Sequence, residues 1–103
     1  MDERTKQALE ASIAHWKRNV EATSPWRASV LAADCELCNT FVFGEDSCCN
    51  CPVAIKHRKL DCPNEYYEAR KAFYLWRSHN CSREYWQSKA QAMLDYLISL
   101  RED

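Results

Sequence analysis

The sequence predicts a mainly α-helical protein in which three helices surround a central metal-binding loop. Its 103 residues include one glycine and three prolines, a composition that favours helices over turn-rich structure. Apolar residues recur at helical spacing on both sides of a cysteine-rich segment, which holds five of the seven cysteines between residues 35 and 51. We therefore expect one domain over residues 1–103, with a long N-terminal helix, a C-terminal helical hairpin and a metal staple.

The N-terminal helix is predicted over residues 5–22. Its apolar residues step by four, three and four, which is the spacing of one stripe on a helix: Leu9, Ile13, Trp16 and Val20. Ser24 and Pro25 end this helix, because proline disfavours helical geometry at the residue before it. The same pair can also cap a short turn that carries Trp26.

Two further helices are predicted in the C-terminal part of the chain. The first, over residues 64–77, begins at Asn64 as a capping residue and carries the stripe Tyr66, Ala69, Phe73 and Trp76. The second, over residues 82–101, begins at Ser82 and carries Trp86, Ala90, Met93, Leu97 and Leu100. The linker between them is short, so we expect an antiparallel hairpin on which the N-terminal helix packs.

The cysteines between the helices predict a zinc loop over residues 34–63. Two Cys-x-x-Cys pairs are separated by nine residues, a spacing that lets two tight turns direct four thiolates at one ion, and a further cysteine follows that could replace one of the four. The ligands are thus expected to be four of five candidates: Cys35, Cys38, Cys48, Cys51 and Cys62. The loop could include a short β-hairpin at the metal.

The expected metal is one structural Zn²⁺ per chain. An iron–sulfur cluster also uses four thiolates, but the compact cysteine run of bacterial ferredoxins is missing. Disulfides are disfavoured because the N-terminal segment MDERTKQALEASIAHW lacks the apolar core of a signal peptide and no run is long enough for a membrane span, which indicates the reducing cytoplasm. Four thiolates close the zinc shell, so we expect a protein that is not an enzyme.

Function is therefore expected to lie in binding, and two surfaces are candidates. The second helix offers tyrosines and arginines beside its buried stripe, and these are expected to contact a protein partner: Tyr67, Arg70, Tyr74 and Arg77. A basic region over residues 56–89 could instead contact nucleic acid, with Lys56, Arg58 and Lys59 at its start. The net charge of −1 favours the protein partner.

Several segments of the chain together resemble small cysteine-rich proteins of tailed bacteriophages and prophages. The shared pattern runs through IAHWKRNV, CELC, CNCPV, a later cysteine, NEYYEA and MLDYLISL, and its most specific part is the order CxLC, CxxCPV and Cys. This chain has Asn50 where that group has glycine, and its turn at Cys62 differs. The resemblance implies a viral origin and carries no activity. Together with the expected binding role, it leads to the hypothesis of a phage accessory protein in the host cytoplasm that binds a host or viral protein.

Overall fold

The part of the protein that its structure describes is mainly helical. The computed structural model describes residues 3–30 and 64–102. Within these ranges the elements are the helices α1 (Glu3–Glu21), α4 (Asn64–Arg77) and α5 (Arg83–Ser99) and the short 3₁₀ turns η1 (Pro25–Arg27) and η4 (Leu100–Glu102).

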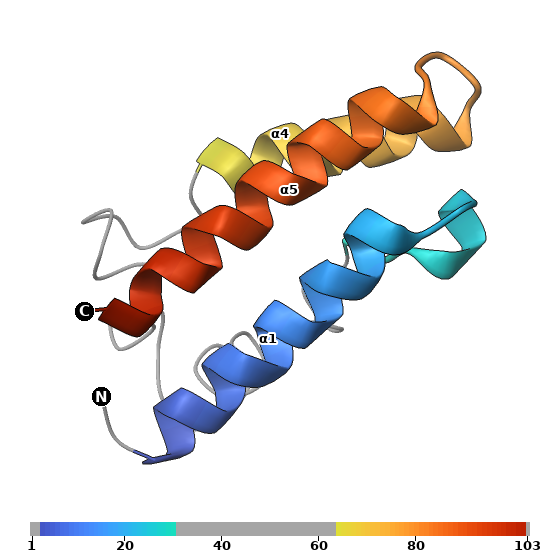
Figure 1. Cartoon of the computed structure of the whole chain (residues 1–103). Helices are drawn as coiled ribbons and strands as arrows, with labels where there is room; N and C mark the ends of the chain where they lie inside the picture. The colour runs from blue at the N-terminus through green and yellow to red at the C-terminus, as the bar shows by residue number, and fades with distance from the viewer. Residues whose placement is uncertain (1–2, 31–63, 103) are drawn as a thin grey trace.

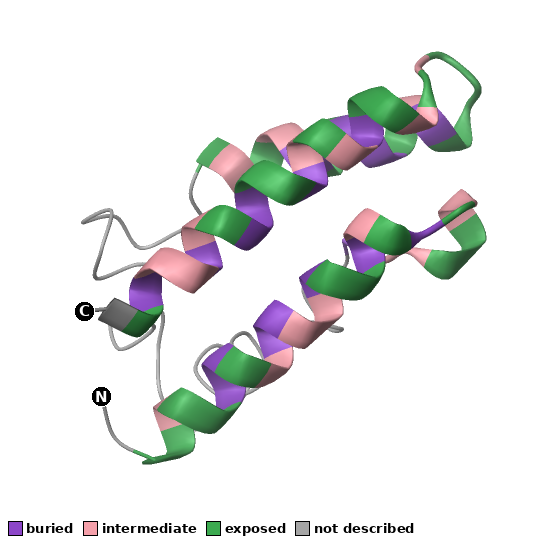
Figure 2. Cartoon of the chain, viewed as in Figure 1, coloured by how far each residue is buried: buried purple, intermediate pink, exposed green. Residues whose placement is uncertain are grey.

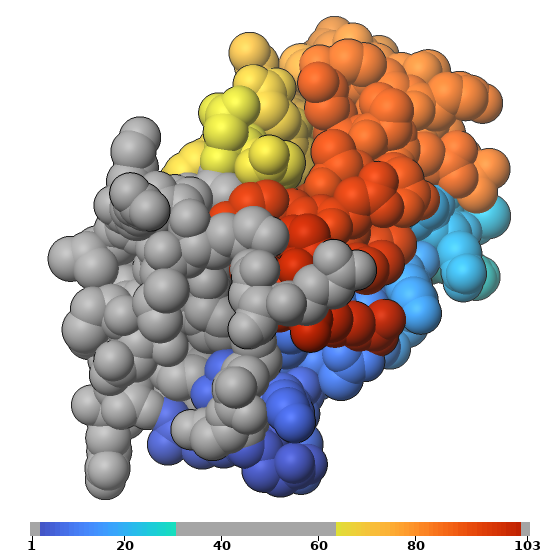
Figure 3. Space-filling view, turned by 60° about the vertical axis from the view of Figure 1, so that its left-hand side comes forward, coloured from blue at the N-terminus to red at the C-terminus, as the bar shows by residue number. Residues whose placement is uncertain are grey.

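Helix α5 is the central element of the fold. It packs against both α1 and α4, whereas α4 also touches η1 at the end of the molecule where the α4–α5 turn lies (Figure 1). The chain runs in one direction along α1 and α4 and returns along α5, so α5 is antiparallel to both of its neighbours (Figure 1). In the space-filling view, α4 and α5 form a continuous surface above α1 (Figure 3). The mainly α three-helix arrangement expected from the sequence is therefore present.

Helix α1 buries one stripe and exposes the rest of its surface. Leu9, Ile13 and Trp16 are buried, as the spacing of four and three residues predicts, and the acidic and basic residues of α1 are exposed (Figure 2). The structure adds Ser12 and Asn19 to the buried side, two polar residues that the apolar pattern did not indicate. The stripe that packs on α5 is thus wider than the apolar residues alone.

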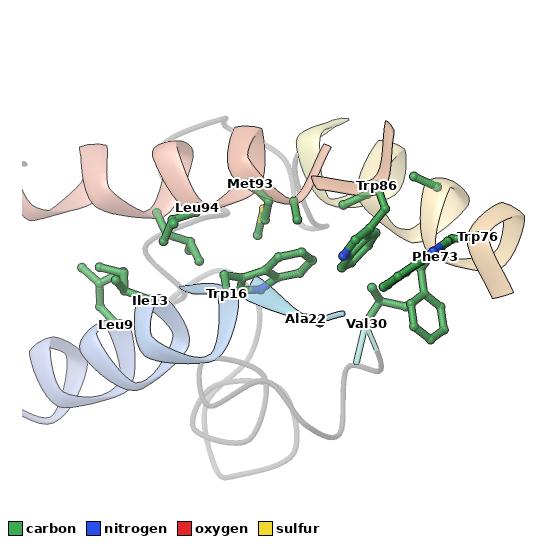
Figure 4. Packing of buried hydrophobic residues seen from close by; sticks show 14 of the residues in the cluster. Leu9, Ile13, Trp16, Ala22, Val30, Phe73, Trp76, Trp86, Met93 and Leu94 are labelled. Carbon is green, nitrogen blue, oxygen red and sulfur yellow. The ribbon is translucent and has the colours of Figure 1, made fainter. Parts of the chain in front are cut away.

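Trp86 of α5 lies where all three helices meet. Its side chain is fully buried, and its ring contacts Phe73 and Trp76 of α4 on one side and Trp16 of α1 on the other (Figure 4). The rings of Trp76 and Trp86 are stacked with centroids 5.8 Å apart, while Phe73 meets Trp86 edge-on at 5.7 Å. These are the offset and edge-to-face geometries that aromatic rings prefer.

The turn between α4 and α5 closes the hairpin with a Schellman motif. The backbone N–H of Asn80 donates to the carbonyl of Leu75 at 2.7 Å, and the N–H of His79 donates to Trp76 at 3.1 Å. His79 has a φ of 64°, which is the left-handed conformation that glycine adopts without steric cost. The next helix begins after Ser82, whose side chain accepts from the backbone N–H of Tyr85 at 3.1 Å, so Ser82 is the predicted N-cap.

The helix ends differ slightly from the sequence expectations. Helix α1 begins two residues before the predicted 5–22 range and ends one residue earlier, and Asn64 is the first residue of α4. The predicted 82–101 helix is α5 with its cap, and its last turn tightens into η4. Ser24 flanks η1 as expected, but its side chain makes no capping hydrogen bond there. The expected zinc loop over 34–63, with its short β-hairpin, lies outside the described residues.

We predict that His79→Gly stabilises the protein by about 0.5–1 kcal/mol. Glycine removes the steric cost of a left-handed residue in the folded state, and its greater conformational entropy in the unfolded state cancels only part of this gain. Urea unfolding followed by circular dichroism measures the change. The matched control is Ser88→Gly within α5, where glycine should destabilise by about 0.5–1 kcal/mol. A loss of stability in His79→Gly would show that the histidine side chain itself supports the turn.

We also predict that Trp86→Phe lowers the free energy of unfolding by about 2–4 kcal/mol, because it removes ring contacts to two helices and an indole N–H that bonds the end of α1. Guanidinium unfolding followed by circular dichroism at the helix band provides the measurement. Trp26→Phe is the control, since that side chain is 83% exposed and its change should stay within about 0.5 kcal/mol of the wild type. Equal effects of the two substitutions would contradict the central role of Trp86.

Candidate interaction surface

The described residues contain one of the two predicted surfaces in full. The four α4 residues expected to contact a protein partner all lie within α4. The five cysteine ligand candidates and the bases Lys56, Arg58 and Lys59 lie outside the described residues, so their positions remain predictions. Within 3–30 and 64–102 no group of three histidine, cysteine or acidic side chains is placed to hold a metal ion.

The four predicted contact residues of α4 lie together on one exposed side of the helix, beside its buried stripe. Ala69, Ala72, Phe73 and Trp76 are buried against the rest of the protein. At about 100° per residue, Tyr67, Arg70, Tyr74 and Arg77 fall on one side of this stripe, and all four are exposed. Tyr67 and Tyr74 keep 43% and 42% of their surface accessible, although the edge of each ring contacts its neighbour in the chain. We call these four residues the α4 face.

The guanidinium groups of the α4 face are not used in ion pairs with other described residues. Neither Arg70 nor Arg77 pairs with a carboxylate of residues 3–30 or 64–102, whereas Lys89 of α5 lies 4.0 Å from Glu68 on the flank of α4. An arginine that the fold does not neutralise can bond a carboxylate on another molecule in bidentate geometry. The α4 face therefore combines exposed aromatic area with available positive charge.

Trp26 extends this surface beyond α4, although it was not among the contact residues predicted from the sequence. Its side chain is 83% exposed, far more than any other large apolar residue for which exposure is described. The guanidinium carbon of Arg77 lies 5.7 Å from the centre of the Trp26 ring, a cation–π contact that joins η1 to the α4 face. The sequence signal for this position was the Ser24-Pro25 pair, which places Trp26 on a turn outside the apolar stripe.

Asn19 holds the segment that carries Trp26. This buried side chain bonds both backbone groups of Ser29: its Nδ2 donates to the Ser29 carbonyl at 2.8 Å and its Oδ1 accepts from the Ser29 N–H at 3.1 Å. His15 Nε2 bonds the same carbonyl at 2.9 Å. The chain reversal after α1 is therefore fixed by side chains of α1, and Trp26 projects from a defined turn.

The shifted pKa values within the described residues belong to groups away from the α4 face. Burial raises the pKa of the Cys81 thiol, whose Sγ lies 3.6 Å from the Ala72 carbonyl, so this cysteine stays protonated and is a poor nucleophile. The bidentate hydrogen bond from Arg101 lowers the pKa of Glu10, with Arg101 Nε 2.7 Å from the Glu10 carboxylate. That exposed pair links η4 to α1 and carries no ligand chemistry of its own.

Two further findings concern the chain as a possible membrane protein and its likeness to known proteins. None of the described helices is both long and apolar enough to cross a bilayer. Comparison of the chain with protein-family models, with curated proteins and with solved structures finds no match.

Proposed function

We propose that the protein is a non-enzymatic binding protein of phage type, acting in the host cytoplasm as an inhibitor or adaptor that docks on a host or viral protein through the α4 face. The observation that carries the proposal is the exposure of two tyrosines and two arginines together on one face of a packed helix, with the arginines unpaired among the described residues. Tyrosine and arginine are among the residues that contribute most to protein interfaces.

The scaffold beneath the α4 face suits an interaction surface. Phe73 and Trp76 anchor α4 against Trp86, so the backbone that carries the exposed residues is held by the core. A surface that is already ordered loses less conformational freedom when it binds than a flexible segment does. Tyrosine adds a large contact area with few rotatable bonds.

Nucleic acid is the second candidate partner. The exposed bases Arg70, Lys71 and Arg77 of α4 support it. The bases Lys56, Arg58 and Lys59 would have to continue this surface. The chain as a whole has a net charge of −1, so it lacks the general attraction to phosphate that nucleic-acid-binding domains possess. We therefore rank a protein partner first.

Zinc has a structural role in this proposal. One Zn²⁺ per chain would be held by four of the five candidates Cys35, Cys38, Cys48, Cys51 and Cys62, a set whose support is the spacing of the two Cys-x-x-Cys pairs. The ion would stabilise the segment between α1 and α4 and would leave binding to the helical surface.

We predict that alanine substitution in the α4 face weakens partner binding by at least about 1 kcal/mol at one or more of Tyr67, Arg70, Tyr74 and Arg77, because truncation removes buried interface contacts. A partner captured from host or phage-infected lysate and then purified allows affinities to be measured by calorimetry. Tyr85→Ala, an exposed tyrosine of α5, is the matched control. Circular dichroism should show unchanged helicity in each variant. If all four variants bind normally, α4 supports the fold and does not contact the partner.

We predict that the purified protein contains about one equivalent of zinc and that cobalt substitution gives the absorption of tetrahedral thiolate coordination. Cys35→Ser or Cys38→Ser should lose the metal. These two cysteines form the first Cys-x-x-Cys pair, which supplies two of the four ligands whichever two of the later cysteines complete the site. Cys81→Ser should retain it. Cys62→Ser decides between the alternatives, since metal loss places Cys62 in the shell. Iron in elemental analysis, with a brown colour, would contradict the zinc assignment.

A further inference from the structure

The surface around Trp26 is hollowed and basic. A hollow of about 380 Å³ is lined by residues of α1 and of the segment that follows it, among them His15, Arg18, Trp26 and Arg27. A second hollow of about 230 Å³ lies beside it and shares Arg18 and Arg27, with Glu21 on its wall. Ligand sites in proteins commonly measure from about 300 to 1,000 Å³, so the larger hollow can take one or two amino-acid side chains.

The arginines at this place form no ion pairs within the described part of the chain. Arg18 and Arg27 form no ion pair with a carboxylate in residues 3–30 or 64–102, and Arg77 lies against the Trp26 ring. We call Arg18, Trp26, Arg27 and Arg77 the Trp26 patch. Arg77 against the indole, with Arg18 and Arg27 on the wall of the adjoining hollow, attracts an anionic group, and the indole offers apolar area beside it.

The exposure of Trp26 is built into the fold. The two hydrogen bonds between Asn19 and Ser29 fix the chain on one side of the η1 turn. On the other side, the carbonyl of Ala22 at the end of α1 accepts from Arg83 Nε at 3.0 Å. With both ends of the turn held by side chains, Trp26 is presented to solvent before any partner arrives, which lowers the entropy cost of binding.

We propose that the Trp26 patch binds an acidic segment of the partner protein, an inference that rests on the proposed protein-binding function and names the chemistry of the partner. A carboxylate of that segment is held by Arg18 and Arg27 at the hollow, and a neighbouring apolar side chain packs on the accessible surface of the Trp26 ring. Arg77 joins this contact to the α4 face, so the two surfaces form one continuous interface.

A carboxylate beside the patch favours a protein segment over nucleic acid. Glu21 lines the second hollow together with Arg18 and Arg27. A nucleic-acid strand carries one negative charge at every phosphate and would meet this carboxylate. The carboxylates of an acidic protein segment can be separated by other residues, so the segment can place an uncharged or basic residue opposite Glu21.

The test uses the full-length protein and a short synthetic peptide with the sequence Glu-Glu-Phe-Glu-Glu, capped at both ends. The chain has four tryptophans, of which Trp16, Trp76 and Trp86 are buried, so the indole N–H resonance of Trp26 reports on this surface by itself. We expect the peptide to shift the Trp26 resonance in a saturable manner at low salt and to leave the other three in place. Added salt should weaken binding, because the charges involved are exposed.

Charge variants identify the residues that hold the peptide. Arg18→Glu and Arg27→Glu should each weaken peptide binding by at least about threefold, as expected for the loss and reversal of an exposed charge pair. Lys6→Glu changes the net charge equally from an exposed position near the other end of α1 and should have little effect. A peptide with glutamine in place of glutamate should bind at least about threefold more weakly than the acidic peptide.

Three results would overturn the inference. The Trp26 resonance could fail to respond to the acidic peptide, it could respond equally to the glutamine peptide, or it could respond more strongly to a short oligothymidylate at equal charge concentration. The last result would assign the patch to single-stranded nucleic acid. The peptide assay is independent of partner capture by the α4 face, so failure of this inference and failure of the proposed function are observed separately.

Discussion

The packing of Trp86 of α5 against α1 and α4 is the interaction on which the described structure depends. Its ring meets Trp16 of α1 and both Phe73 and Trp76 of α4, while its indole N–H donates to the carbonyl of Asn19 at 3.0 Å. Burying a tryptophan of about 200 Å² stabilises the fold by roughly 5 kcal/mol at ordinary transfer values. The hydrogen bond also fixes the end of α1 relative to α5, which burial of the ring alone would not do.

The surface proposed for binding follows from that packing. With Phe73 and Trp76 directed at Trp86, the geometry of α4 places Tyr67, Arg70, Tyr74 and Arg77 on the outer face. The same junction positions Asn19, whose side chain holds Ser29 and so sets the place of Trp26. One buried aromatic cluster thus determines where the exposed aromatic and cationic residues lie, although none of its rings belongs to the proposed interface.

Polar interactions have a local role in this protein. Asn19 bonds both backbone groups of Ser29 at the chain reversal, and Gln87 Nε2 donates to the carbonyl of Val20 at 2.9 Å near the end of α1. The Gln87 bond satisfies a carbonyl at the C-terminal end of a helix, where carbonyl groups lack partners within the helix. The exposed Arg101–Glu10 pair joins the N-terminal half of α1 to η4, and solvent screening limits its effect on stability.

The sequence by itself determined the helical class, because a helical repeat in the apolar residues reports directly on which face must be buried. The stripes of Leu9, Ile13 and Trp16 and of Phe73 and Trp76 specify both the helices and the outward position of the α4 face. Cysteine spacing likewise motivates a zinc site, whose residues lie outside the described structure. Tertiary structure alone decided that Trp26 is exposed beside Arg77, because a tryptophan in a short turn can equally fold onto the core. Its position depends on hydrogen bonds between Asn19 and Ser29, ten residues apart, and on the contact with α4, which no local pattern encodes.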